Sequence, residues 1–378
     1  MDGKVRGSEG GGPAGLVIGA APVRLWGMTS QERLRRALAR VGLGLADPGH
    51  AGSLVILRAD WALDESLVKA LVARPGACLV SDTGEAVAAH VASQVAGDSA
   101  AACARLEAGE VPAGCSAAGA EALVPAYNAA LRKRAPPLLA RLTPESLASV
   151  ERRMFDGSYK GVTDFVTKYV WPRPAQAATK LCALAGMTPN QVTAIGAALT
   201  LAAFWLFWTG HFGWGLAAAW AMTFLDTVDG KLARVTLTSS KVGNVFDHGI
   251  DLVHPPFWWW AWVVGLQAGT HPLANPYLVI LVVVGGYVAQ RIEEGVFLSA
   301  FKLEMHAWRR FDSAFRLVTA RRNPNLVLLT LAALAGRPDA GMEAVAVWTA
   351  ICLVVHFAQI VQAAAARRRG PVTSWMAG

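Results

Sequence analysis

Short apolar runs alternate with amphipathic ones over residues 14 to about 130. The apolar runs have the length of buried strands, and the amphipathic runs repeat their apolar positions with the spacing of a helix. The strand-like runs are 14–20, 53–59 and 77–82, and the helix-like runs are 30–42 and 64–74. Such alternation predicts a parallel sheet flanked by helices. The run 14–23 also has the apolar centre and small-residue end of a short signal peptide, but it suits the first buried strand better.

From residue 192 onward the pattern changes to long apolar runs separated by short polar ones. The first run, 192–209, contains no charged residue, and as a helix it would measure about 27 Å, close to the hydrocarbon thickness of a bilayer. The further runs are 213–233, 245–265, 274–298, 325–336 and 342–364. The sequence therefore predicts an α-helical polytopic membrane domain with six transmembrane helices, preceded by a soluble α/β domain.

Lys and Arg are unevenly distributed between these predicted spans. The segments 231–243, 302–323 and 367–369 are rich in basic residues, whereas 210–213 and 266–273 contain none. Cytoplasmic loops carry the excess of basic residues. We therefore expect an integral protein of the inner or plasma membrane, with both termini and the α/β domain in the cytoplasm.

Residues 141–190 join the two parts of the chain. They mix charged, aromatic and apolar residues, and no stretch is apolar for long enough to span a bilayer. An amphipathic helix along the cytoplasmic surface, bracketed by Pro172, Pro174 and Pro189, accounts for this pattern. The predicted domains are 1–140, 141–190 and 191–370.

Composition supports a membrane location and argues against two other classes of protein. The chain is 54% hydrophobic, which is typical of a membrane protein. The net charge of +8 would suit a nucleic-acid binder, but the basic residues lie beside apolar runs, so we expect no nucleic-acid partner. The five cysteines form no CxxC pair and no zinc-like spacing with His, so we expect reduced cysteines that serve packing.

Four aspartates lie close together in the sequence and are flanked by apolar residues. An ionised carboxylate at membrane depth is costly unless it is paired, protonated or bound to a metal. Helical spacing places the aspartates on two stripes, each with small residues beside them. The first stripe consists of Asp226, Asp229, Gly230, Ala233 and Arg234, and the second of Gly243, Asp247 and Asp251.

Two helices that face each other along these stripes would gather four carboxylates at one point. Like charges so close cannot all stay ionised unaided. One divalent cation, or a pair roughly 3.5–4 Å apart, resolves the conflict, and hard oxygen ligands favour Mg²⁺ or Mn²⁺ over zinc. The small residues leave room for an extended ligand, and Arg234 could pair with a phosphate.

A proton relay or transporter ion site is the alternative, but it has no need for Gly, Ala and Arg at these offsets. His248 and His254 are nearby, but we expect neither to bind metal and His254 to be a buried hydrogen-bonding residue.

The pattern D-x2-D-G-x2-A-R-x8-G-x3-D-x3-D, from Asp226 to Asp251, resembles the motif of the CDP-alcohol phosphotransferase family at every specified position. The resemblance covers about residues 140–370 and includes "TPNQVT" before the first span. It implies six transmembrane helices, a homodimer, and transfer of a substituted phosphate from a CDP-linked donor to an alcohol acceptor with release of CMP. One of the two substrates would be a lipid.

The same resemblance implies roles for individual residues. Asp226, Asp229 and Asp247 would hold Mg²⁺ or Mn²⁺, as a pair of ions, and Asp251 would complete the cluster and act as the general base. The CDP-binding residues would be Asp229, Gly230, Ala233, Arg234 and Gly243. The acceptor-binding residues would be Lys241, Arg291, Arg321 and Arg322. Anchoring on the cytoplasmic side explains Arg321 and Arg322 equally well.

The N-terminal domain resembles a divergent nucleotidyltransferase, as in fused enzymes that make CDP-inositol and then transfer inositol phosphate. Residues 24–42, 54–72 and 84–91 carry the likeness, and Asp60 stands where such enzymes keep a metal-binding Asp. The usual Gly-rich phosphate loop is reduced to "APVRLWG", so little remains to cradle a triphosphate. We therefore expect a degenerate binding or scaffolding domain rather than an active cytidylyltransferase.

Several functions stay open on the sequence alone. The favoured one is a membrane transferase that uses a CDP-polyol, such as CDP-inositol, as donor. The alternative is transfer from CDP-diacylglycerol to a soluble alcohol or inositol phosphate. A non-catalytic membrane or binding protein with a relic motif is a distant third, because the aspartates are intact.

Overall fold

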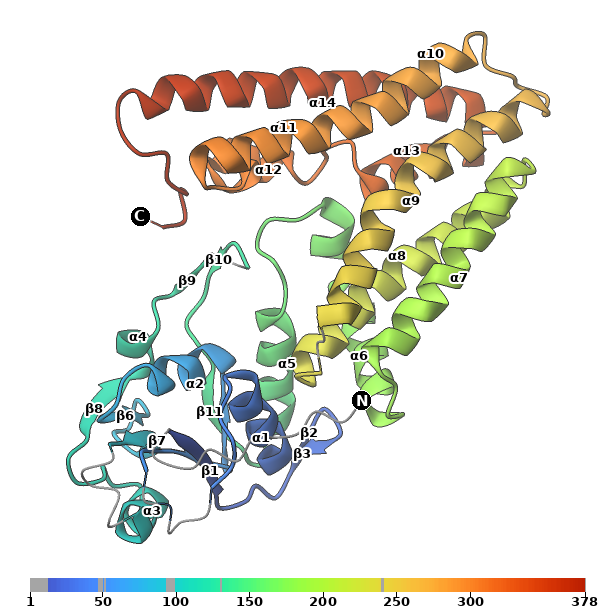
Figure 1. Ribbon diagram of the computed structural model, residues 1–378. Helices are drawn as coiled ribbons and strands as arrows, with labels where there is room; N and C mark the ends of the chain where they lie inside the picture. Colours follow the sequence, from blue (N-terminus) through green and yellow to red (C-terminus); the bar gives the residue numbers. More distant parts are fainter. Residues whose placement is uncertain are drawn as a thin grey trace. The chain divides into compact units, whose positions relative to one another are not determined.

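The computed structural model describes residues 13–46, 50, 52–92, 99–129, 131–238 and 241–377, without the side chains of 241–248 (Figure 1). The chain divides into two compact units. The first consists of the chain up to Asn128, Arg134–Tyr159 and Arg234–Thr238; the second consists of Ala129–Lys133, Lys160–Ala233 and the chain from Ser239 onward. The predicted boundaries near 140 and 190 stay a prediction, because compactness alone does not show which segments fold independently.

A five-stranded mixed sheet forms the centre of the first unit. Its strand order is β1 (Ala14–Ile18), β4 (Leu54–Arg58), β7 (Ala86–Val91), β6 (Ala77–Val80) and β8 (Ser116–Gly119). β1 is parallel to β4 and β6 is parallel to β8, whereas β7 is antiparallel to both β4 and β6. The predicted strands are confirmed, but the expectation of a parallel sheet is wrong at β7. The reason is that a tight turn, with Gly84 at φ +83°, joins β6 to β7 and leaves no room for the crossover helix that a parallel neighbour requires.

Helices cover both faces of this sheet. On β4, Val55 and Leu57 pack with α1 (Ser30–Arg40) and α2 (Glu65–Val72), whereas Leu54 and Ile56 pack with α3 (Ser99–Glu107). Successive side chains of a strand point to opposite faces, so the uninterrupted apolar run of β4 serves two layers. The run 14–23 is therefore the first strand of a buried sheet, as predicted.

The remaining elements of the first part of the chain are short. They are β2 (Arg24–Leu25), β3 (Met28–Thr29), β5 (Trp61–Leu63), α4 (Ala120–Leu123), β9 (Tyr127–Asn128), β10 (Lys133–Arg134), β11 (Leu139–Arg141) and α5 (Leu147–Gly157).

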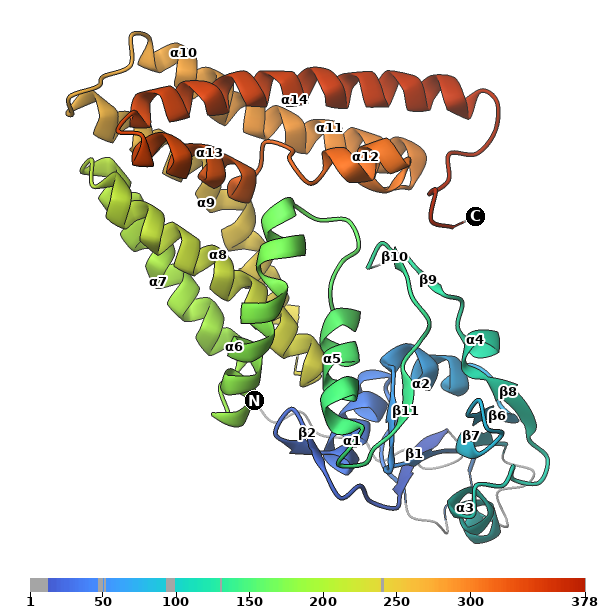
Figure 2. The ribbon, with the colours of Figure 1, turned by 180° about the vertical axis from the view of Figure 1, so that it is seen from behind.

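The second unit is helical. Its elements are η2 (Val166–Val170), α6 (Pro172–Leu184), α7 (Pro189–Trp208), α8 (Phe212–Val235), α9 (Lys241–Gln267), α10 (Pro276–Ile280), η3 (Leu281–Gly285), α11 (Gly286–Phe301), η4 (Met305–Ala307), α12 (Arg310–Phe315), α13 (Arg322–Leu334) and α14 (Pro338–Arg367). Figures 1 and 2 both show α11 and α13 lying along α14. α6 begins at Pro172 and leaves Leu181 and Leu184 exposed, and its location at a membrane surface stays a prediction.

Among the residues that the structure describes, three helical segments are long and apolar enough to cross a membrane. They are Pro189–Trp208, Pro276–Phe301 and Pro338–Arg367. Each of the six predicted spans coincides with a helix, but in the described part of the chain α8 and α9 do not meet this criterion. α13 has 13 residues, about 20 Å of helix, which is shorter than the hydrocarbon core of a bilayer. The number of six spans is therefore not confirmed, although the apolar helices indicate an integral membrane protein.

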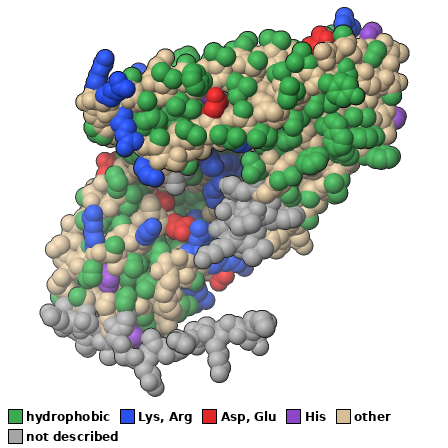
Figure 3. Space-filling model, turned by 45° about the horizontal axis from the view of Figure 1, so that its top comes forward, with side chains coloured by type: hydrophobic (Ala, Val, Ile, Leu, Met, Phe, Trp, Pro, Cys, Tyr) green, Lys and Arg blue, Asp and Glu red, His purple; other side chains and the backbone are tan. Residues whose placement is uncertain are grey.

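Apolar side chains occupy both the interior and the outer surface of this unit. Trp258, Trp259 and Trp262 are buried between the helices, and Trp258 Nε1 donates to Thr200 O at 2.9 Å. On the outside, α14 exposes Val354 and Phe357, and hydrophobic side chains cover much of the face formed by α10, α11 and α14 in Figure 3. An apolar outer face of this kind suits contact with lipid.

Candidate functional site

The first part of the site is the contact between α7 and α8. α7 begins with a capping box, in which Thr188 and Gln191 bond each other's backbone, and Pro189 follows the cap. This start directs Thr193 toward α8, where its hydroxyl donates to Asp229 Oδ2 at 2.6 Å. Asp229 is 3% exposed, and its Oδ1 has no hydrogen-bond partner among the described residues. A buried carboxylate oxygen without a partner is costly and is the kind of atom that a cation would satisfy.

The second part of the site joins α8 to α9 through α13. Arg322, at the first residue of α13, donates from Nη1 to Asp251 Oδ1 at 2.6 Å and from Nη2 to Asp226 Oδ2. One guanidinium thus bridges two carboxylates that belong to different stripes of the sequence motif. The positive charge of Arg322 neutralises part of the negative charge of these two neighbouring carboxylates.

The other residues of the motif are only partly described. Gly230, Ala233 and Arg234 lie on α8 as the helical spacing predicts, and Arg234 Nη1 donates to Ser158 O at 3.3 Å. Three predicted residues lie in the segment of α9 whose side chains are outside the described part, so no geometry is assigned to them: Lys241, Gly243 and Asp247.

His254 is a buried hydrogen-bonding residue, as predicted. It is 6% exposed, and its Nδ1 lies 2.7 Å from Ile250 O, one turn back on the same helix. Its ring also packs edge-on against Trp258, with 4.5 Å between ring centroids. Its Nε2 has no hydrogen-bond partner among the described residues, so the expectation that His254 binds no metal stays a prediction.

The three predicted acceptor-binding residues whose side chains the structure describes, Arg291, Arg321 and Arg322, do not form a single group. Arg321 donates to Glu294, and Arg291 Nη1 lies 3.2 Å from Glu294 Oε2. Arg322, the next residue, points instead to the aspartates of α8 and α9. The structure therefore brings Arg291 and Arg321 together at one carboxylate and separates Arg322 from both.

Two histidines beside Glu294 were not predicted from the sequence. His306 Nε2 lies 3.2 Å from Glu294 Oε1, and the His306 and His356 ring centroids are 5.3 Å apart. Burial lowers the pKa of His306 to about 3, so its ring is neutral at pH 7. The two histidines are far apart in sequence and have no metal-like spacing. Thr193 was also missed, although it lies within "TPNQVT".

Asp60 in the first unit is held by arginines. Arg58 donates to Asp60 Oδ1 at 3.0 Å and Oδ2 at 2.7 Å, and its Nη1 lies 2.9 Å from Glu85 Oε1. Burial lowers the pKa of Arg58, but its bonds to the two carboxylates outweigh burial and raise the pKa above the ordinary value. Both oxygens of Asp60 therefore have a cationic partner without a metal.

Part of the chain is similar to known proteins. Residues 186–355 match the sequence profile of a family described as CDP-alcohol phosphatidyltransferase. The chain is 36% identical over 115 residues to phosphatidylinositol phosphate synthase from Mycobacteroides abscessus, covering 29% of this chain and 52% of that protein.

Two further relatives are more distant or match over a shorter stretch. Archaetidylinositol phosphate synthase from Pyrococcus horikoshii is 40% identical over 82 residues, which is 21% of this chain and 42% of that protein. Cholinephosphotransferase 1 from Gallus gallus is 27% identical over 146 residues, which is 36% of this chain and 42% of that protein. The chain thus spans about half the length, or less, of these curated relatives.

Proposed function

We propose that the protein is a membrane-embedded CDP-alcohol phosphotransferase, because residues 186–355 match the profile of the CDP-alcohol phosphatidyltransferase family. It moves a substituted phosphate from a CDP-linked donor to an alcohol, and CMP leaves. The observation that carries the proposal is the convergence of Asp226 and Asp251 on one guanidinium. Asp229 stands three residues after Asp226 in the motif, and its Oδ1 has no hydrogen-bond partner among the residues that the structure describes. Carboxylates that repel one another and need a counter-charge suit a bound divalent cation.

The carboxylates would hold the metal and move the proton. In this proposal Asp226, Asp229 and Asp247 hold Mg²⁺ or Mn²⁺, as a pair of ions, and Thr193 orients Asp229. When bound, the ions neutralise the diphosphate and make CMP a better leaving group. Asp251 accepts the proton of the acceptor hydroxyl as general base, which the partial exposure of its side chain permits.

The arginines and small residues would position the two substrates. Gly230, Ala233, Arg234 and Gly243 line the pocket for the cytidine diphosphate. The acceptor-binding residues are proposed to be Lys241, Arg291, Arg321 and Arg322. This role is best supported for Arg322, because its guanidinium contacts Asp226 and Asp251 and therefore lies directly beside the proposed base.

The favoured donor is a CDP-polyol such as CDP-inositol, passed to a lipid alcohol. Two relatives are named as synthases of an inositol phosphate lipid. Their names support an inositol-containing substrate for this protein. Transfer from CDP-diacylglycerol to inositol phosphate or another soluble alcohol is the alternative. We further propose a homodimer with six spans per chain, an active site that faces the cytoplasm, and a location in the inner or plasma membrane.

The first unit is proposed to be a degenerate nucleotidyltransferase-like domain. The saturation of Asp60 by arginine supports this proposal, since a carboxylate held at both oxygens is poorly placed to bind a catalytic metal. Synthesis of a CDP-alcohol from CTP by the intact protein would contradict it.

The test of the transferase is CMP release from defined donors. Purified full-length protein in lipid is incubated with labelled CDP-inositol, CDP-glycerol or CDP-diacylglycerol, a lipid extract and Mg²⁺ or Mn²⁺. We expect CMP and a labelled phospholipid from one donor, and none from Asp226→Asn. If no donor yields CMP above the level of this variant, the proposal is wrong.

A further inference from the structure

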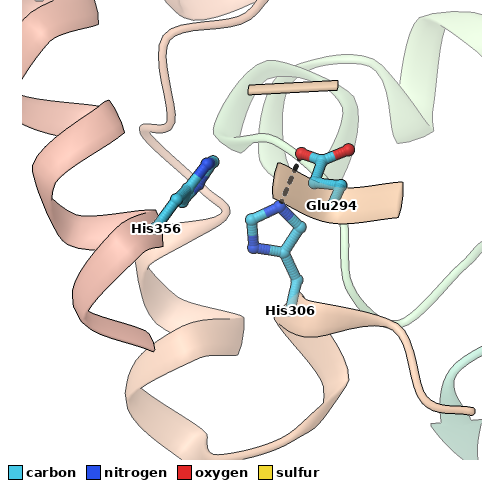
Figure 4. Close-up of side chains that lie close together, drawn as sticks. All are labelled: Glu294, His306 and His356. Atoms are coloured by element: carbon cyan, nitrogen blue, oxygen red, sulfur yellow. Dashed lines mark hydrogen bonds and ion pairs between the residues drawn. The ribbon is translucent and has the colours of Figure 1, made fainter. Parts of the chain in front are cut away.

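A second group of metal-binding side chains lies between α11, η4 and α14. Glu294, His306 and His356 each offer one ligand atom, and these atoms all lie within 4.8 Å of one another. Figure 4 shows the three side chains converging from three separate segments of the chain. Both histidines are buried, His306 at 3% and His356 at 0% exposure.

The histidines have ring nitrogens without hydrogen-bond partners. Within the described residues, His356 has none at either nitrogen, and His306 has none at Nδ1. Buried polar groups in folded proteins are nearly always paired, and an unpaired one calls for a ligand or a water to satisfy it. The side chains are aimed at one another in the interior, where an ion bound by His306 Nε2 and Glu294 would also satisfy one of the unpaired nitrogens of His356.

We propose that Glu294, His306 and His356 bind one transition-metal cation, for which zinc is the expected ion. The separation of His306 Nε2 and Glu294 Oε1, 3.2 Å, is close to the roughly 3.4 Å between two ligands on a tetrahedral zinc ion with bonds of about 2.0–2.1 Å. His356 completes a set of two imidazoles and one carboxylate, which zinc commonly takes.

Glu293 lies near His356, where the outer carboxylate partner of a metal-bound histidine would stand. Its Oε2 lies 3.6 Å from His356 Nδ1 and has no hydrogen-bond partner among the described residues. A histidine that binds metal through one nitrogen typically donates its other N–H to a carboxylate, which fixes the ring orientation. This places Nε2 of His356 as the nitrogen for the metal.

The neighbouring arginines restrict which cation can bind. Arg291 and Arg321 both contact Glu294, so they compete with a cation for its lone pairs, although a carboxylate has about four acceptor sites. A hard ion such as Mg²⁺ depends on oxygen ligands and would bind poorly here, whereas zinc gains most of its affinity from the imidazoles. This site is separate from the aspartates of α8 and α9, and the inference does not rest on the proposed transferase activity.

The experiment measures the metal that the full-length protein retains. The protein is purified with an affinity tag that binds no metal, dialysed against zinc at micromolar concentration and then against metal-free buffer, and analysed by elemental mass spectrometry. We expect about one zinc per chain, a loss of at least tenfold in His306→Ala and in His356→Ala, and no change in the matched control His254→Ala. Zinc that is absent, or equal in all four proteins, overturns the proposal.

A second measurement guards against variants that fail to fold. Cobalt is loaded in place of zinc into the unmodified protein, and X-ray absorption at the cobalt edge reports the ligands. We expect a four-coordinate site with two imidazoles. The conservative variant His356→Gln should fold and lose one imidazole from the spectrum. A cobalt spectrum without imidazole ligands contradicts the assignment even if every variant is unstable.

Discussion

Two carboxylates that the sequence marks as metal ligands, Asp60 and Asp229, have opposite surroundings. Asp60 is held at both oxygens by Arg58, two residues away on the same chain segment. Asp229 has a hydroxyl at one oxygen and no partner at the other among the described residues. A carboxylate at a family's metal position therefore indicates a metal site only when no other cation already pairs with it. Asp60 already has one, whereas Asp229 still needs one.

The largest effect is expected from Asp229→Asn. The substitution removes a metal ligand, and a bound metal supplies several kcal/mol of stabilisation to the transition state, so CMP release should fall about 10³-fold or more. Asp60→Asn, measured on the same donor, is the control and should keep full turnover. Excess EDTA should abolish the activity of the unmodified protein; full turnover in EDTA would contradict the metal assignment.

Asp251→Asn should separate chemistry from binding. An amide cannot accept the acceptor's proton, and loss of a positioned general base costs about 10²–10⁴ in rate. Donor affinity with Mg²⁺, measured by calorimetry, should stay near normal. Asp247→Asn should weaken metal and donor binding together. Equal collapse of donor affinity in both variants would make Asp251 mainly a metal ligand.

Thr193→Val tests whether the partner of Asp229 orients it. Loss of a residue that positions a metal ligand typically costs 10–100-fold in metal affinity, and we expect an effect in this range for Mn²⁺, measured by electron paramagnetic resonance. The control is Thr200→Val on the same helix, because the Thr200 hydroxyl donates to Gly196 O and not to a carboxylate. The role of Thr193 is refuted if both variants bind Mn²⁺ with unchanged affinity.

Arg322→Gln should destabilise the protein most when metal is absent. The substitution leaves Asp226 and Asp251 without their cationic partner. Because both carboxylates are partly exposed, we expect a loss of only about 1–2 kcal/mol. Thermal unfolding in EDTA should show a lower Tm, and Mn²⁺ should restore it. Arg337→Gln is the control, since Arg337 pairs with Asp339 and not with an aspartate of the motif, and Mn²⁺ should not change the Tm of this variant relative to the unmodified protein.

The smallest effect concerns Asp60. Asp60→Asn weakens the contact to the buried Arg58, but Glu85 remains as a partner, so we expect a loss of about 1 kcal/mol in stability. Thermal unfolding should show a Tm lowered by a few degrees, with no change in CMP release. A large loss of transferase activity in Asp60→Asn would show that Asp60, like Asp229, has a role in the reaction.

Local patterns determined the elements of this protein. The apolar runs identified β1, β4 and β6, and the helical spacing identified α1, α2 and the stripe on α8, because side-chain periodicity depends only on the local backbone. The same reasoning failed at β7. Whether a strand runs parallel or antiparallel depends on the length of its connection, and the Gly84 turn was too short to contain the helix that a parallel strand requires.

Partners that are distant in sequence were decided by tertiary structure alone. Arg322 reaches Asp226 and Asp251, Thr193 reaches Asp229, and Glu294 meets His306 and His356 only because separate helices pack side by side. No spacing rule connects residues on different helices, since helix packing sets their distance. The sequence by itself therefore determined which carboxylates need a counter-charge, and the packing of α7, α8, α9 and α13 decided which residues stand beside them.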